Sequence, residues 1–239
     1  MIVLGFDTAT PATTVALAQG DTYVRIEARN DPEPGERPGH ATRLLPLIAE
    51  VMERAGVGWE ELDRLAVGVG PGSFTGLRIG LATARSLAQS RGLPLVGVSS
   101  LEALAKGSDP SPKGVRPLAE KGQSASRVTA VIDARRGEVF AAQWEGERQT
   151  LAPAALAPEA LADFLRAAGR NALAVGDGAV RFRERLESAG ADIPADDSPL
   201  HRLSAAYICL LGARAEIPDP ETVLPAYVRE PDAKPRPRA

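Results

Sequence analysis

The sequence predicts an α/β fold made of two related lobes, each a mixed sheet flanked by helices. Two observations carry this prediction. Apolar runs of strand length alternate with helical apolar patterns along most of the chain. A strand that ends in an aspartate, followed by a tight turn and a second strand, occurs at residues 2–18 and again at residues 128–144. Such internal repetition indicates two lobes of common design.

The first lobe is expected at residues 1–105. Residues 30–39 are rich in proline, glycine and charge and predict a loop. The helix that follows is apolar on one face, and Gly56 marks its end because glycine suits the left-handed conformation of a helix C-terminus. We expect strands at residues 2–7, 14–18, 22–28, 65–69 and 95–98, and helices at residues 41–55, 74–90 and from residue 101.

The second lobe is expected at residues 128–230, with its last helix packing back on the first lobe. Residues 106–127 hold several prolines with little periodicity, as linkers or insertions do. Residues 231–239 are basic and proline-rich, which predicts a disordered tail. We expect strands at residues 128–133, 138–144 and 172–175, and helices at residues 158–168, 180–189 and 203–215.

Composition predicts a soluble cytoplasmic protein. The 28 Lys and Arg residues stand against 31 Asp and Glu residues, a net charge of −3, so any contact with RNA is expected to be shared with a partner. Cys209 is the single cysteine, which rules out a disulfide within the chain and fits a reducing compartment. Residues 1–6 are apolar but short and lack a basic flank, so they predict a strand and not a signal peptide. No apolar run is long enough to span a membrane.

Residues 70–80, GPGSFTGLRIG, form the most distinctive segment, a glycine-rich junction between a strand and a helix. Ser73 or Thr75 can cap the helix. Gly76 and Gly80 lie one turn apart inside it, and each costs about 1 kcal/mol relative to alanine. If the neighbouring leucine stripe faces the sheet, the glycine ridge faces outward or sideways, where a second protein can dock. Tight packing of the ridge on its own sheet is the alternative. The ridge contains Gly72, Gly76, Gly80 and Thr83.

Two lobes that each open with an aspartate-ended hairpin resemble the actin-like ATPase (ASKHA) fold of sugar kinases, Hsp70 and actin. The resemblance becomes specific at residues 6–10 (FDTAT), 70–80, 97–104 (GVSSLEAL) and 133–138 (DARRGE). Weaker support comes from His40 with Leu44-Leu45-Pro46, and from residues 225–229 (PAYVR). Together these segments resemble the TsaB (YeaZ) family of bacterial threonylcarbamoyladenosine biosynthesis accessory proteins. The resemblance covers most of the chain outside residues 30–39, 106–127 and the tail.

This resemblance implies a scaffold without catalysis of its own. Members pair with a catalytic paralogue, TsaD, which transfers a threonylcarbamoyl group to the adenosine beside the anticodon of tRNA, and a small ATPase, TsaE, joins them. We therefore expect a heterodimer with TsaD, contact with tRNA only through the complex, and a homodimer when the chain is alone. The surface expected to meet the partner contains His40, Leu44, Leu45, Ile48, Gly72, Ser73, Phe74, Gly76, Gly80 and Thr83.

The resemblance also allows two enzymatic alternatives. A metalloprotease-like hydrolase would need metal ligands, but His40 has Leu44 one helical turn on, and His201 lies far along the chain, so no metal site is expected. Ser73 lacks a Gly-x-Ser-x-Gly context and a histidine–acid pair, so it is expected to cap its helix, and Cys209 to lie in the core.

An ATP-dependent small-molecule kinase would need a phosphate-binding turn in each lobe. In the first lobe that turn contains Pro11, which has no N–H, and in the second it contains Arg135 and Arg136 in place of glycines. Residues 176–178 (GDG) either approach an adenosine or form a plain turn. No cofactor of its own is expected, and ATP or ADP at an interface shared with a partner stays open. The residues expected at such a residual nucleotide site are Asp7, Thr8, Asp133 and Arg136.

Overall fold

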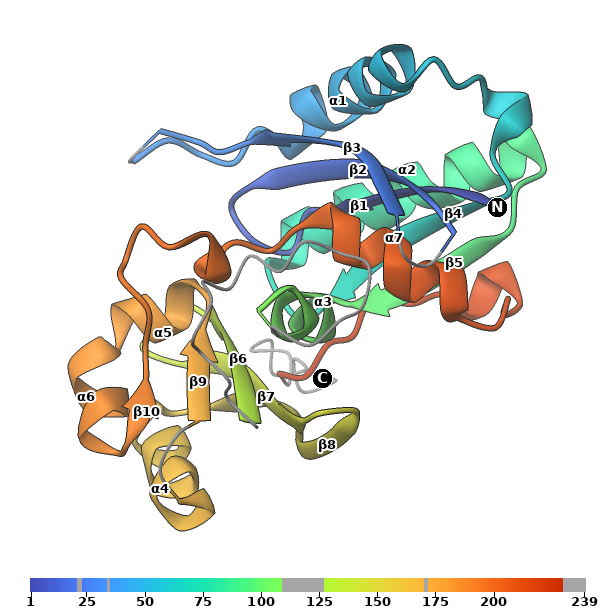
Figure 1. Cartoon of the computed structure of the whole chain (residues 1–239). Helices are drawn as coiled ribbons and strands as arrows, with labels where there is room; N and C mark the ends of the chain where they lie inside the picture. Colours follow the sequence, from blue (N-terminus) through green and yellow to red (C-terminus); the bar gives the residue numbers. More distant parts are fainter. Residues whose placement is uncertain (21–22, 34, 109–126, 170–171, 230–239) are drawn as a thin grey trace, which may run out of the picture.

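The computed structural model describes residues 1–20, 23–33, 35–108, 127–169 and 172–229. Within these residues, two five-stranded mixed sheets form the two lobes (Figure 1). Their strand orders, β3-β2-β1-β4-β5 and β8-β7-β6-β9-β10, are equivalent. In each lobe the first strand pairs antiparallel with the second and parallel with the fourth, which confirms the predicted repeat.

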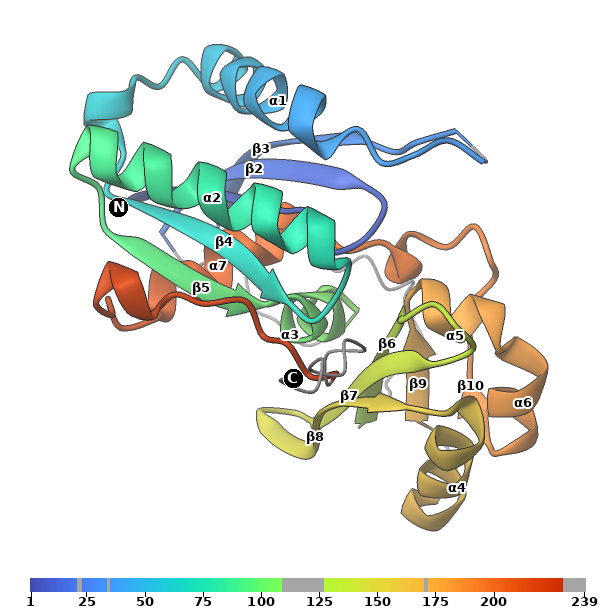
Figure 2. The same ribbon diagram turned by 180° about the vertical axis from the view of Figure 1, so that it is seen from behind.

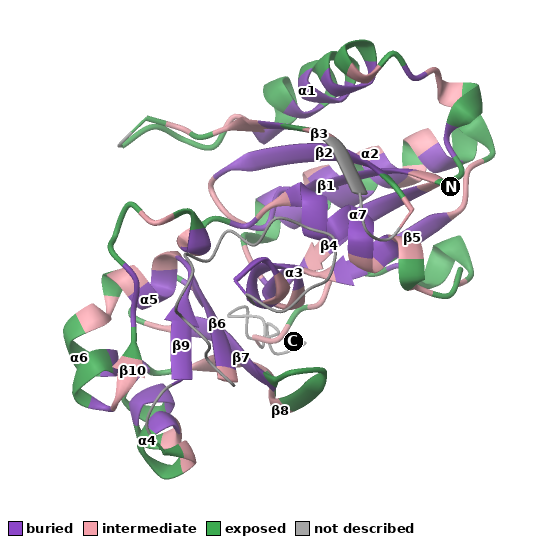
Figure 3. Cartoon of the chain, in the orientation of Figure 1, coloured by how far each residue is buried: buried purple, intermediate pink, exposed green. Residues whose placement is uncertain are grey.

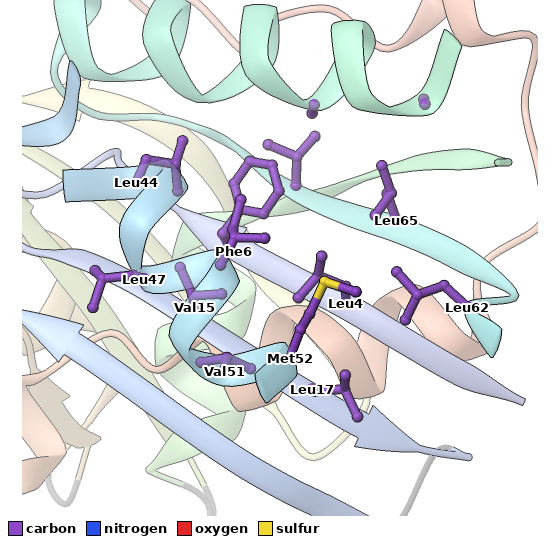
Figure 4. Packing of buried hydrophobic residues seen from close by; sticks show 14 of the residues in the cluster. Leu4, Phe6, Val15, Leu17, Leu44, Leu47, Val51, Met52, Leu62 and Leu65 are labelled. Carbon is purple, nitrogen blue, oxygen red and sulfur yellow. The ribbon is translucent and has the colours of Figure 1, made fainter. Parts of the chain in front are cut away.

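The strands of the first sheet are β1 Ile2–Asp7, β2 Thr13–Gln19, β3 Tyr23–Asn30, β4 Arg64–Gly70 and β5 Leu95–Ser99. Two long helices, α1 His40–Ala55 and α2 Phe74–Arg91, cover one face of this sheet (Figure 2). Gly56 ends α1 in the left-handed conformation, and the Ser73 hydroxyl caps α2 by accepting a hydrogen bond from the Gly76 N–H. The apolar faces of α1 and α2 enclose a core with β1, β2 and β4, to which Phe6 of β1 and Leu44 of α1 both contribute (Figure 4).

The other face of the first sheet is covered by α7 Ala205–Arg214, which follows the whole second lobe in the sequence. Its buried residues pack against β1, β2 and β4. Between the lobes lies α3 Ser100–Gly107, whose Leu101 and Leu104 pack on the second sheet. The two lobes therefore share a helix at their junction, and α7, which follows the second lobe in the sequence, packs on the first sheet.

The strands of the second sheet are β6 Arg127–Asp133, β7 Val139–Glu145, β8 Arg148–Leu156, β9 Ala172–Val175 and β10 Ala191–Asp192. Three helices, α4 Pro158–Ala168, α5 Asp177–Arg181 and α6 Arg183–Ser188, close its outer face. Short 3-10 turns occur at η1 Trp59–Glu61, η2 Pro199–His201 and η3 Pro220–Thr222.

The sequence pattern missed β8 and the two-residue β10, and it misplaced one helix. Strand β8 contains Pro153 and several alanines, which lower strand propensity, but its position at a sheet edge tolerates a proline. The helix expected at residues 180–189 begins at Asp177 and breaks at Phe182 into α5 and α6. Most of the expected linker at 106–127, and the tail at 231–239, lie outside the described residues. In the part that the structure describes, no helix combines the length and apolarity needed to cross a membrane.

Candidate functional site at the lobe junction and on helices α1 and α2

Asp7, at the end of β1, is fully buried and bonded within its own lobe. Its Oδ1 accepts a hydrogen bond from the Ala9 N–H at 2.6 Å, and its Oδ2 accepts one from the Ser100 hydroxyl at 2.5 Å. Burial raises the pKa of the Asp7 carboxyl, against these hydrogen bonds, which lower it. Position 68 must be glycine because a Cβ there would come within 1.7 Å of the carboxylate. Asp7 therefore joins β1 to the start of α3.

The glycine ridge of α2 packs on the β1–β2 turn of its own lobe. A Cβ at Gly76 would lie 2.0 Å from the Thr8 carbonyl oxygen, and one at Gly80 would lie 2.3 Å from Thr8 Oγ1. The Thr8 hydroxyl donates a hydrogen bond to the Gly76 carbonyl at 2.8 Å. A Cβ at Gly72 would likewise overlap the Ala9 carbonyl oxygen. The prediction that this ridge faces a partner is wrong, since its bare backbone admits the turn and not a second protein.

Three further residues expected at the partner surface are also internal. His40 is 3% exposed, and its Nδ1 shares a hydrogen bond of 2.8 Å with the Thr13 hydroxyl. Burial lowers the pKa of His40, which favours the neutral ring. Leu44 and Ile48 are core residues at 1% exposure each. These side chains position α1 and do not reach its outer surface. The prediction that they contact the partner is therefore wrong.

The outer surface of α1 and α2 nevertheless remains apolar in part. Leu45 is 54% exposed and Phe74 is 53% exposed, while Ser73 is exposed and Thr83 is half-buried. The exposed residues recur at helical spacing on each helix, and both helices cover the same sheet face (Figure 3). We call this surface the α1–α2 face; its exposed small and apolar members are Ala41, Leu45, Pro46, Ala49, Phe74 and Ala82.

The corresponding turn of the second lobe, between β6 and β7, is built quite differently. Arg135 and Arg136 have φ values of 61° and 54°, a left-handed conformation that costs about 1–2 kcal/mol for each non-glycine residue. Asp133 accepts a hydrogen bond from the Arg135 N–H at 3.0 Å and pairs with Arg181 at 2.7 Å. Asp177 supports the turn by accepting a hydrogen bond from the Asp133 N–H at 2.9 Å, and burial raises the pKa of Asp177.

A cavity of about 850 Å³ lies between the two turns. Residues 9–11 and 72–74 line it from the first lobe, residues 132–136 from the second, and residues 226–229 from the C-terminal segment. Among the described lining residues, Arg78, Arg135, Arg136 and Arg229 are basic and Asp133 and Asp177 are acidic. Of the four residues expected at a nucleotide, the structure brings Asp133 and Arg136 to this cavity. Asp7 and Thr8 do not line it, because they bond beneath the turn instead.

Three backbone donors at the two turns are engaged by the chain itself. The Ala9 N–H donates to Asp7, and the Arg135 N–H donates to Asp133. The Ala134 N–H donates to the Glu138 carbonyl oxygen across the second turn. The arrangement thus offers arginine side chains to an anion, while these three N–H groups are not available to hold a phosphate as backbone amides do in nucleotide sites.

The remaining chemically suggestive residues are structural. In the described part of the chain, no group of three or more His, Cys, Asp or Glu side chains gathers as metal ligands do. His201 Nδ1 accepts a hydrogen bond from the Gly176 N–H at 3.1 Å within the second lobe. Gly176 itself packs on β6, where a Cβ would come within 2.1 Å of the Val131 carbonyl oxygen. Cys209 is buried in the α7 core.

Sequence reasoning missed the cavity residues Arg78, Phe140, Tyr227 and Arg229 as a group. They come from α2, β7 and the C-terminal segment, so their separation along the chain leaves no pattern in the sequence. The one available signal was residues 225–229, which resembled the family but suggested no contact. Their place against both lobes is visible only in the folded chain.

Comparison with protein families gives one match by a family model. The model described as "TsaD: tRNA N6-adenosine threonylcarbamoyltransferase" matches residues 32–183 of this chain. The matched range includes α1, α2 and both sides of the lobe junction.

Curated relatives extend this likeness. The "tRNA threonylcarbamoyladenosine biosynthesis protein TsaB" of Escherichia coli (strain K12) is 36% identical over 186 residues, covering 74% of this chain and 72% of that protein. The protein of the same name from Haemophilus influenzae is 32% identical over 207 residues, covering 81% of this chain and 80% of that protein.

Solved structures agree in fold. "YeaZ from Pseudomonas aeruginosa" superposes with a TM-score of 0.71 at 30% identity, covering 95% of this chain and 99% of that chain. The ethanolamine utilization protein EutJ from Carboxydothermus hydrogenoformans has a TM-score of 0.51 at 15% identity, covering 87% and 90%. The second likeness concerns the fold alone.

Proposed function

The chain belongs to the TsaB (YeaZ) family and has the actin-like fold that its sequence predicted, and from this premise we propose that it is a non-catalytic subunit required for threonylcarbamoyladenosine formation on tRNA. The names of its relatives support a role in this tRNA modification. In the proposal, the chain activates a catalytic TsaD-family paralogue by forming a heterodimer with it.

The observation that carries the proposal is the contrast between a closed turn and an open helical surface in the first lobe. Asp7 and Thr8 hold the β1–β2 turn tightly under α2, so the turn serves as a support. The α1–α2 face above it leaves Leu45 54% exposed, and Phe74 at the start of α2 is 53% exposed although its ring also contacts Tyr227 and Arg78. An apolar surface shared by two neighbouring helices favours an interface.

The match of the TsaD family model supports a paralogue as the occupant of the α1–α2 face. Two chains of one fold can pair equivalent surfaces about an approximate two-fold axis, as isologous dimers do. By the same reasoning the face pairs with a second copy of this chain when the paralogue is absent. TsaE and tRNA join through the heterodimer in this scheme, since the chain is acidic overall.

We infer that ATP or ADP does not bind tightly to this chain alone and needs groups from the partner. The cavity between the lobes offers arginines, but the amides of Ala9, Ala134 and Arg135 are already bonded within the chain. The carboxylate residue Asp133 also lines the cavity. Titration calorimetry with Mg-ATP tests this inference on the chain alone and on the heterodimer. Turnover of ATP dependent on a small molecule would favour the kinase alternative, and stoichiometric bound metal would favour the hydrolase.

Reconstitution tests the main proposal. The purified chain, a TsaD-family partner, TsaE, tRNA and threonylcarbamoyl-adenylate are combined with one protein left out at a time, and modified adenosine is measured by mass spectrometry. The proposal expects the modification only when both this chain and the partner are present. Full modification without this chain, or modification by this chain without the partner, would refute it.

A further inference from the structure

The C-terminal segment returns across both lobes after α7. From η3 it runs beside β5 of the first lobe and then turns toward β6 and β7 of the second (Figure 2). Residues 226–229 line the cavity between the lobes. A segment in this position can hold the lobes together if it is anchored on both.

The first anchor lies on the first lobe. Val223 is 4% exposed, and a Cβ at Gly97 would lie 3.1 Å from its Cγ1. The Val223 side chain therefore packs on β5 at the position where that strand has a glycine. Arg85 of α2 donates a hydrogen bond of 2.7 Å to the Val223 carbonyl oxygen. The Ala226 N–H donates one of 2.8 Å to the Val69 carbonyl oxygen at the end of β4.

The second anchor is an aromatic contact at the mouth of the cavity. The rings of Tyr227 and Phe74 lie 5.4 Å apart between centroids. The guanidinium of Arg78 lies 3.8 Å above the centre of the Phe74 ring and donates a hydrogen bond of 3.4 Å to the Tyr227 hydroxyl. This contact joins the segment to the first turn of α2.

The third anchor lies on the second lobe. Arg229 forms an ion pair with Glu138, which directly precedes β7, and its guanidinium lies 5.5 Å from the centre of the Phe140 ring. Arg229 is about a quarter exposed, so this pair is less screened than a fully solvated one. Only one residue, Val228, separates Arg229 from Tyr227, which leaves little slack between the contacts with the two lobes.

We propose that residues 223–229 form a latch, an extended peptide bound in cis, that holds the two lobes closed over the cavity. Helix α3 joins the lobes independently of the latch, since it contacts β4 and β5 of the first sheet and β6 and β7 of the second. The latch adds a reversible contact made by one aromatic ring and one arginine two residues apart. The surface that contacts residues 223–229 is therefore a site for an extended peptide with a Tyr-x-Arg pattern. Release of the latch gives access to the cavity arginines.

Distances between the lobes test the latch directly in the full chain. Spin labels are attached to cysteines introduced at Glu53 in α1 and Ala167 in α4, both exposed, while the buried native Cys209 stays unlabelled. The variants Arg229→Ala and Glu138→Gln break the ion pair from opposite sides. Each is expected to broaden the distance distribution, and Leu224→Ala is the matched control because that neighbouring side chain is 60% exposed.

Two further arms separate latch release from misfolding. Exchanging the charges, Arg229→Glu with Glu138→Arg, is expected to restore the narrow distribution that each single exchange loses. A synthetic peptide of residues 221–229, added to the Arg229→Ala chain, is expected to narrow the distribution, whereas the same peptide with alanine at both Tyr227 and Arg229 does not. Amide exchange at residues 134–140 should accelerate about tenfold in Arg229→Ala. Unchanged distances and exchange in both single variants would overturn the proposal.

Discussion

The β1–β2 and β6–β7 turns occupy equivalent places in the two lobes and do opposite things. Each follows a strand that ends in an aspartate. In the first lobe that aspartate is buried and bonded to the start of α3, and the turn packs against the glycines of the ridge. In the second lobe the aspartate lies at the edge of a cavity, beside two arginines in strained left-handed conformations.

The proposal assigns support to the first turn and recognition to the second. The first turn is bonded to α2, and in the proposal this contact keeps the α1–α2 face rigid for a partner. The second turn keeps its charges and its backbone strain, a feature that concentrates where proteins bind ligands. A protein with both turns open would resemble a nucleotide-dependent enzyme more closely than this chain does.

The largest expected effect is on the free energy of unfolding, which should respond differently to substitutions at the two turns. Gly76→Ala places a Cβ against the Thr8 carbonyl oxygen and is expected to lower the free energy of unfolding by about 3 kcal/mol. Gly137→Ala meets nothing within 4 Å and should cost only about 1 kcal/mol, from its positive φ. Urea unfolding measures both. Equal costs would contradict the distinction between the turns.

The same packing revises an earlier expectation for the ridge. Reading the ridge as an interface predicts that Gly80→Trp abolishes pairing while the monomer stays folded. The structure predicts loss of folding instead, because that position is filled by Thr8. Circular dichroism of the isolated variant decides between the two outcomes.

A smaller effect should appear in pairing. Leu45→Asp places a charge on the α1–α2 face and is expected to weaken binding to the TsaD-family partner about 30-fold, equivalent to about 2 kcal/mol. Its stability should change by less than about 0.5 kcal/mol because the side chain is exposed. Biolayer interferometry measures the affinity, with Ala167→Asp on the second lobe as the control. An unchanged affinity would show that the partner does not bind at the α1–α2 face.

The buried aspartate of the first turn should give stability a distinctive pH dependence. Burial raises the pKa of Asp7 in the folded protein, so its contribution is fully present below the unfolded pKa, near 4, and is lost as pH rises through the folded value. The stability of the natural chain relative to Asp7→Asn should therefore fall as pH rises from about 4. Urea titrations from pH 4 to 8, with the exposed Asp197→Asn as control, check this. If the stability of the natural chain and that of Asp7→Asn changed with pH in parallel, the prediction would be contradicted.

The smallest effect concerns the bond that orients His40. Thr13→Val removes the hydroxyl bonded to His40 Nδ1 and should cost about 1 kcal/mol, since it leaves a buried ring nitrogen without that partner. Thr13→Ser keeps the hydroxyl and should cost less. Thermal unfolding of the two variants provides the comparison. A larger loss in the serine variant would show that packing of the methyl group matters more than the bond.

The sequence was sufficient for the fold but not for the direction in which its key helix faces. Apolar periodicity located α1 and α2, and the repeated strand–aspartate unit predicted two lobes. The same glycines that identified α2 were assigned to the wrong side of it, because a bare ridge suits an internal turn as well as a partner. Only the contact with Thr8, about 70 residues away in the chain, decides between them.

The cavity was partly predictable for a similar reason. Asp133 ends a recognisable strand and Arg136 lies in the turn after it, and both line the cavity; their place at a nucleotide stays a prediction. Asp7 occupies the equivalent position, yet the Ser100 hydroxyl turns its carboxylate away from the cavity. Tyr227 and Arg229 join the site from the far end of the chain, which local patterns do not reveal.

The dependence of tRNA modification on subunit concentration tests the scaffold account most directly. Threonylcarbamoyladenosine is measured in the reconstituted system while either the natural chain or Leu45→Asp is titrated against a fixed amount of the catalytic partner. The account predicts the same maximal rate for both, reached at about 30-fold higher concentration of the variant. A variant that lowers the maximal rate without shifting the midpoint, or one that changes neither, would contradict activation through the α1–α2 face.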